Sequence, residues 1–178
     1  MPASNNLDRP KRLYDLLRTS RLNAKYYGYK LHRIQRWNKA FEIGIALGAT
    51  GSGLSGWSIW QSHFGQTSWI VIAGISGIAA IIKPILAMNQ TIERYSKLFA
   101  GHNRNFIRLS QLCSDIATQR QVTPEMNTEY LRINEDYTEL AALDDPVPQA
   151  ALQARFEREV NSEIPPDSLW WPSDQKAP

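Results

Sequence analysis

The sequence has a single cysteine, Cys113, among its 178 residues. One cysteine excludes a disulfide framework and a cysteine-rich zinc site. The three histidines, His32, His63 and His102, have no metal-binding spacing to one another or to this cysteine. The sequence also lacks a nucleophile elbow and a glycine-rich phosphate loop placed after a strand. We therefore expect no catalytic residue, no metal site and no bound cofactor, and we do not expect an enzyme.

Charged residues are scarce in the middle of the chain. Residues 40–88 contain two formal charges, Glu42 and Lys83. Acidic residues are scarce before position 111: residues 1–110 contain 15 Lys or Arg and 4 Asp or Glu, whereas residues 111–178 contain 5 and 13. The mean composition of 43% hydrophobic and 21% charged residues hides this segregation. A fully soluble monomer is not expected from such a pattern.

Two apolar runs, residues 40–60 and 69–88, make up most of this central segment. As a helix each run would be about 30 Å long, which matches the hydrocarbon thickness of a bilayer. The uncharged residues 61–68 between them are long enough only to turn. A buried core hairpin is the alternative, but a chain this short has too little other apolar surface to cover two helices that are apolar all round. A cleaved signal peptide does not fit, because 39 residues precede the first run. We predict a transmembrane hairpin.

Basic residues flank this hairpin and are missing from its loop. Six Lys or Arg and no acid lie between Ser20 and Lys39, and Arg94, Lys97, Arg104 and Arg108 follow the second run. Residues 61–68 contain neither Lys nor Arg. The positive-inside rule therefore predicts that both termini are cytoplasmic and that the outer loop is very short.

Small residues recur every four positions in the first apolar run. They are Ala40, Gly44, Gly48, Ser52 and Gly56, and Ala73 and Gly77 repeat the spacing in the second run. Small side chains at this spacing let helix backbones approach closely in lipid. The stripe has two interpretations: packing within one hairpin, or packing between subunits that leaves Thr50, Ser52, Ser55 and Ser58 to line a polar path.

The two charges of the hairpin also have two interpretations. Glu42 and Lys83 would lie at neighbouring depths near the cytoplasmic face of an antiparallel hairpin. Charges there must pair, snorkel or face water. In the first interpretation Glu42 pairs with Lys83, or Lys83 snorkels to the interface. In the second, the charges form a ring at the inner mouth of an oligomeric pore. Pro84 follows Lys83 directly and removes a backbone donor, so it predicts a kink, which would serve as a gate, or a helix end.

The parts outside the hairpin are predicted to be helical, so the fold class is an all-α membrane protein. Residues 1–39 form a basic cytoplasmic helix, 89–162 form cytoplasmic helices, and 163–178 form an irregular tail. Apolar residues at 3- and 4-residue spacing mark one seam before the hairpin and another after it. The seams are Leu13, Leu17, Ala24, Tyr27, Leu31, Ile34 and Phe41, and Ile92, Tyr95, Phe99, Phe106, Leu109, Cys113 and Ile116.

Two shorter helices are expected after these seams. Thr123-Pro124 is a helix start, with Thr as the N-cap and Pro at the first helical position, and that acidic helix should stop before Asp144. Pro148 can open another helix, which should run through about Val160.

One line of the second long helix is basic: Arg94, Lys97, Arg104 and Arg108. It either meets anionic lipid and the acidic helix folded back over it, or it converges with its copies in neighbouring subunits on an anionic ligand. Tyr or Trp side chains would be available to stack on a base. A nucleic-acid duplex is not expected as a partner, because the membrane explains where the basic residues lie.

The order of these parts resembles the SLATT family of bacterial two-helix membrane effectors. The resemblance rests on a basic helix with tyrosines (NAKYYGYKLHRIQRWNK), a first span rich in small residues (IGIALGATGSGLSGW) and a short outer loop. A second span ending IAAIIKP, a long amphipathic helix (ERYSKLFAGHNRNFIRLSQL) and an acidic helix complete it. The match covers about residues 10–145, and its motifs are diffuse. The tail with Trp170 and Trp171 has no counterpart in the family.

The resemblance implies a homo-oligomeric, pore-forming effector in the bacterial cytoplasmic membrane, acting in anti-phage defence by permeabilisation or depolarisation. It also implies regulation by a partner nucleotidyltransferase or its nucleotide product. A different class of function stays open: a two-span membrane anchor or adaptor that recruits a soluble partner through its cytoplasmic helices.

Overall fold

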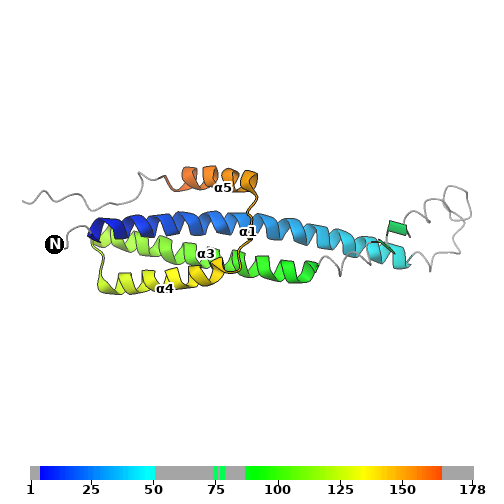
Figure 1. Ribbon diagram of the computed structural model, residues 1–178, viewed down its shortest axis with the longest axis horizontal. Helices are drawn as coiled ribbons and strands as arrows, with labels where there is room; N and C mark the ends of the chain where they lie inside the picture. The colour runs from blue at the N-terminus through cyan, green and yellow to red at the C-terminus, as the bar shows by residue number, and fades with distance from the viewer. Residues whose placement is uncertain (1–4, 51–73, 76, 79–86, 166–178) are drawn as a thin grey trace, which may run out of the picture. The chain divides into compact units, whose positions relative to one another are not determined.

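The computed structural model describes residues 5–50, 74–75, 77–78 and 87–165, and it describes side chains only from residue 11 on and not at 47–50. The described residues form four labelled helices: α1 (Asn5–Thr50), α3 (Met88–Gln119), α4 (Pro124–Ala141) and α5 (Ala150–Glu163) (Figure 1). Residues 74–75 and 77–78 are also helical. Within this described part there is no strand, so the all-α class is confirmed.

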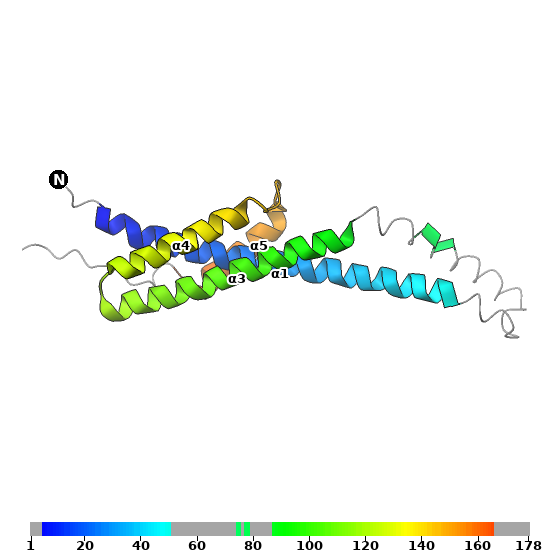
Figure 2. The same cartoon turned by 90° about the horizontal axis from the view of Figure 1, so that it is seen from below.

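The chain divides into two compact units. The first unit, the bundle, comprises Met1–Tyr29 and Arg94–Pro178, and the second comprises Lys30–Glu93. In the bundle, α3 runs antiparallel to α1, α4 folds back along α3, and α5 lies along α1 (Figures 1 and 2). The bundle therefore brings together segments that flank residues 30–93 in the sequence.

The start of α1 follows the predicted seam. Leu13, Leu17, Ala24 and Tyr27 are buried, and Ser20 continues the same line with no exposed surface. This 3- and 4-residue spacing places one face of the helix against the rest of the bundle. The helix continues to Thr50, so the expected boundary between residues 39 and 40 lies inside one unbroken helix.

The turn between α3 and α4 is built as its sequence predicts. Arg120 has a positive φ of 53° and its N–H donates to the carbonyl of Ile116, which ends α3. Thr123 caps α4, since its hydroxyl accepts from the N–H of Met126 at 3.3 Å, and Pro124 is the first helical residue. α4 ends at Ala141, before Asp144, which confirms that prediction. α5 begins at Ala150 and extends past Val160 to Glu163.

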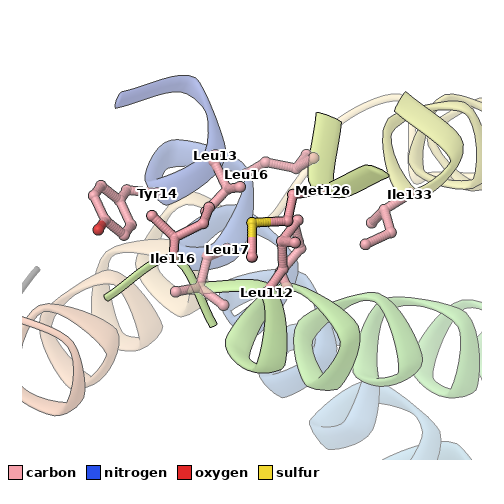
Figure 3. Packing of buried hydrophobic residues seen from close by; sticks show 9 residues of the cluster. Leu13, Tyr14, Leu16, Leu17, Leu112, Ile116, Met126 and Ile133 are labelled. Carbon is pink, nitrogen blue, oxygen red and sulfur yellow. The ribbon is translucent and has the colours of Figure 1, made fainter. Parts of the chain in front are cut away.

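Buried apolar side chains form two clusters in the bundle. The first cluster joins α1, α3 and α4 through nine buried residues (Figure 3): Leu13, Tyr14, Leu16, Leu17, Leu109, Leu112, Ile116, Met126 and Ile133. The second cluster joins α1, α3, α4 and α5 through Tyr26, Tyr27, Leu98, Leu140 and Phe156. The amphipathic α3 thus packs against both of its neighbours, and the burial of these side chains is the main source of bundle stability.

The predicted membrane hairpin falls mostly outside the described residues. Of its two runs, 40–60 and 69–88, the structure describes residues 40–50, 74–75, 77–78 and 87–88. Among the residues that the structure describes, no helix has the length and apolar character to cross a membrane. Ser52, Gly56, Lys83 and Pro84 lie outside the described residues, and Gly48 lies in α1 where its surroundings are not described.

Candidate functional site

The predicted basic line lies on α3, and the structure divides it into paired and unpaired side chains. Arg108 is paired twice with α4: its Nε and Nη2 donate to Glu129 Oε1 at 3.0 and 2.8 Å, and its Nη1 donates to Asp136. The acidic helix therefore folds back over this arginine, as one of the two interpretations predicted. Arg108 is a link between α3 and α4.

Arg94 is paired with the segment that joins α4 to α5. Its Nη2 lies 2.7 Å from Asp145 Oδ1, and the Asp145 side chain is 8% exposed. The N–H of Asp145 donates to the hydroxyl of Tyr27 at 3.0 Å, and the N–H of Gln149 donates to the hydroxyl of Tyr26 at 3.0 Å. The α4–α5 connection is therefore tied to α1 at Asp145 and Gln149, and to α3 at Asp145.

Lys97 and Arg104 line a pocket between α3 and α4. The pocket has a volume of about 440 Å³, and the other residues around it are Ala100, Gly101, Asp136, Glu139, Leu140 and Leu143. Within the described part of the chain, neither cation forms an ion pair, whereas Asp136 is already paired with Arg108. The structure thus brings two of the four predicted cations to one pocket and separates the other two. Two unpaired cations beside an apolar wall suit an anion with an apolar portion.

Gly101 shapes the wall of this pocket. A Cβ built on Gly101 would lie 2.6 Å from Cδ2 of Leu140, so the buried Leu140 side chain packs into the space that the glycine leaves on α3. Leu140 thereby belongs both to the pocket wall and to the second apolar cluster. A ligand in the pocket would touch the same side chain that holds α4 against the bundle.

His102, the residue after Gly101 in α3, is completely buried. Its ring stacks on Tyr27, with centroids 5.8 Å apart and planes at 9°, and Tyr137 meets it edge-on at 5.6 Å. Its Nε2 lies 3.4 Å from Asp144 Oδ1. Burial raises the pKa of the Tyr27 hydroxyl, and burial also raises that of Tyr137. Sequence reasoning missed this cluster, because a histidine on a mixed helix gives no periodic signal.

α5 is held to α1 by a set of polar contacts that we call the α5 clasp: Arg18, Arg21 and Lys25 on α1, and Glu159, Asn161 and Glu163 on α5. Arg21 Nε lies 2.9 Å from Glu163, and Lys25 Nζ pairs with Glu163 and, at 3.2 Å, with Glu159. Arg18 donates to the side chain of Asn161. The hydrogen bond from Lys25 is the main cause that lowers the pKa of each glutamate. The sequence predicted α5 but not its partner.

The second unit contains the described part of the predicted hairpin. Glu42 is exposed and accepts a hydrogen bond from Asn38 Nδ2, one turn earlier, at 3.0 Å. Both interpretations of the Glu42–Lys83 pair stay predictions, since Lys83 is outside the described residues. A Cβ on Gly44 or Gly77 would meet no described atom within 4 Å. Large apolar side chains are exposed there: Trp37 (59%), Ile43 (52%), Ile75 (62%) and Ile78 (60%).

Two features of the described residues concern metal binding and thiol reactivity. Among them, no group of three or more His, Cys, Asp or Glu side chains could hold a metal ion. Burial raises the pKa of the Cys113 thiol to about 12, so the reactive thiolate is scarce at neutral pH.

Comparison of the sequence and fold with family models, curated proteins and solved structures finds no match. The resemblance to the SLATT family therefore stays a prediction from the residues that carry it.

Proposed function

We propose that this chain is a SLATT-like, homo-oligomeric pore in the bacterial cytoplasmic membrane, with both termini cytoplasmic and with gating by a nucleotide from a partner nucleotidyltransferase. The observation that carries the proposal is the near absence of charge in residues 40–88 between two strongly basic flanks. Such a segment is soluble in lipid, and its flanks fix its orientation. As an anti-phage effector it would act by permeabilising or depolarising the membrane.

The exposed side chains of the second unit support this proposal. Ile43, Ile75 and Ile78 are each more than half exposed. Large aliphatic side chains in such positions need lipid or another protein surface to cover them. Within the described part of the chain, a Cβ on Gly77 would meet no atom within 4 Å, and we place the packing of helices from neighbouring subunits at this stripe.

The α3–α4 pocket supports the regulatory part of the proposal. Its two cations, Lys97 and Arg104, can bind phosphate oxygens, and Leu140 and Leu143 provide an apolar surface for a base. Glu139 limits the choice of ligand, because a carboxylate that has no ion-pair partner among the described residues repels a polyanion and accepts hydrogen bonds from amino groups. A nucleotide with few phosphates and an amino-bearing base fits this arrangement better than inorganic phosphate.

A substitution in the stripe tests the pore directly. In liposomes that contain the purified full chain, Gly77→Leu should reduce ion efflux or oligomer formation, because a large side chain keeps helix backbones apart. Ser114→Leu is the matched control, since it adds a leucine on the exposed face of α3. Unchanged efflux in Gly77→Leu would show that the pore does not depend on close helix packing at the stripe. An inserted oligomer without any flux would favour the membrane adaptor.

A further inference from the structure

The wall of the α3–α4 pocket and the α4–α5 connection are parts of one stretch of chain. Leu140 and Leu143 line the pocket, and the next two residues, Asp144 and Asp145, lie in the connection. The N–H of Leu143 donates to the carbonyl of Leu140 at 2.9 Å, and the N–H of Asp144 donates to the carbonyl of Ala141 at 3.2 Å. These bonds continue the last turn of α4 into the connection, so a shift of the pocket wall would carry Asp144 with it.

The two aspartates hold this stretch against α1 and α3. Asp144 Oδ1 lies 3.4 Å from Nε2 of His102, whose ring stacks on Tyr27 of α1. Asp145 Oδ1 accepts from Arg94 of α3 at 2.7 Å, and the N–H of Asp145 donates to the Tyr27 hydroxyl at 3.0 Å. These contacts fix the connection at the point where the pocket wall ends.

The start of α5 belongs to the same packed region. Phe156 of α5 and Leu140 of the pocket wall are both buried in the second cluster. The N–H of Gln149, the residue before α5, donates to the hydroxyl of Tyr26 at 3.0 Å. In Figure 1 the connection passes α1 on its way from α4 to α5. One cluster on α1 therefore contains the pocket wall and the first turns of α5, which lie at the two ends of the connection.

We propose that residues 140–156 dock on α1 and α3 as one cooperative segment, and that a ligand in the α3–α4 pocket locks this segment, and with it the start of α5, in the docked position. The part that concerns the ligand rests on the proposed nucleotide site. Leu140 and Leu143 complete the pocket only while the segment is docked. A ligand that needs this wall binds the docked state alone, so it stabilises that state by an amount set by its concentration and its Kd.

Hydrogen exchange of the full-length protein in detergent, followed at single amides, tests the cooperative segment without a ligand. Tyr26→Phe keeps the ring in the second cluster and removes the acceptor of the Gln149 N–H. If the segment opens as one unit, the amides of Leu143 and Asp144 at the pocket wall should exchange about two- to tenfold faster. Tyr29→Phe, at a position that is 40% exposed on the same helix, is the matched control and should leave them unchanged. Unchanged exchange of Leu143 and Asp144 in Tyr26→Phe would overturn the inference, whatever happens at Gln149.

Adenosine monophosphate is the probe for the effect of a ligand. At about nine times its Kd, which calorimetry supplies, the exchange of residues 143–149 should slow by about tenfold. Residues 120–123, in the turn at the other end of α4, should exchange as before. Lys97→Gln combined with Arg104→Gln should remove the protection.

The outcomes separate this inference from the proposed nucleotide site. Binding without protection of residues 143–149 would overturn the inference and leave the nucleotide site standing. No binding would overturn both the nucleotide site and the lock, while the comparison with Tyr26→Phe would still decide whether the segment opens as one unit.

Discussion

Leu140 of α4 packs against Gly101 of α3 so closely that a Cβ at position 101 would lie 2.6 Å from its Cδ2. This contact joins the α3–α4 pocket to the second apolar cluster. It also lies one residue from His102, which contacts Tyr27 of α1. The pocket, the packing of α4 on α3 and the hydrogen bond from the α4–α5 connection to Tyr27 of α1 therefore involve neighbouring side chains.

Gly101→Ala should lower the free energy of unfolding by about 1–3 kcal/mol, because overpacking forces α4 away from α3. The gain in helix propensity from Gly to Ala, about 1 kcal/mol, would offset part of this loss. Thermal unfolding followed by circular dichroism measures the change. Ser96→Ala, on the exposed face of the same helix, should leave Tm nearly unchanged. A Gly101→Ala protein as stable as this control would mean that Leu140 moves aside freely.

Lys97→Gln combined with Arg104→Gln should abolish nucleotide binding and leave Tm nearly unchanged, because neither cation is paired in the described part of the chain. Calorimetric titration with nucleoside mono- and diphosphates measures the binding. Arg155→Gln combined with Arg158→Gln, which removes two exposed cations from α5, serves as the control for net charge. If the double variant binds nucleotides as tightly as the unaltered protein, the α3–α4 pocket is not the regulatory site.

Arg108→Gln should behave in the opposite way, with lower stability and intact nucleotide binding. It removes the links from α3 to Glu129 and Asp136. The arginine is 29% exposed and both partners are 37% exposed, so solvent screening limits the expected loss to about 1 kcal/mol. Chemical denaturation at low and high salt measures it, and the difference between the two proteins should shrink in high salt. A loss of nucleotide binding at unchanged stability would place Arg108 in the ligand site.

The α5 clasp should weaken in acid. The pKa of Glu159 and of Glu163 is lowered in the folded protein, chiefly by the hydrogen bond from Lys25. A carboxylate whose pKa is lower in the folded than in the unfolded protein stabilises the fold at pH values above its ordinary pKa of 4.5. This stabilisation is lost as the pH falls through the pKa that the carboxylate has in the folded protein. Release of α5 should therefore set in below about pH 4.5.

Fluorescence transfer between labels on α1 and α5 measures this release. Glu163→Gln should release α5 at neutral pH more readily than Glu157→Gln, since Glu157 bonds to Gln153 within α5. Transfer that does not change between pH 7 and pH 3.5 would show that Phe156 and Val160, both buried, hold α5 without the clasp.

Local signals in the sequence predicted much of the bundle. The Thr123-Pro124 pair fixed the start of α4, and apolar spacing identified the buried face of α1. The burial of His102 and Asn105 was missed because periodicity considers apolar residues, and these two polar residues interrupt the apolar line of α3. The docking of α5 on α1 depends on pairs such as Lys25 and Glu159, which are far apart in the sequence. The basic line on α3 was visible, but only the fold distinguishes Arg94 and Arg108, which are paired, from Lys97 and Arg104.

Ion efflux from liposomes that contain the purified full chain is the direct test of a nucleotide-gated pore. Efflux is measured before and after addition of a panel of cyclic and linear nucleotides. At least one nucleotide should switch the efflux on or off. No efflux under any condition, from protein that is inserted and oligomeric, would contradict the pore.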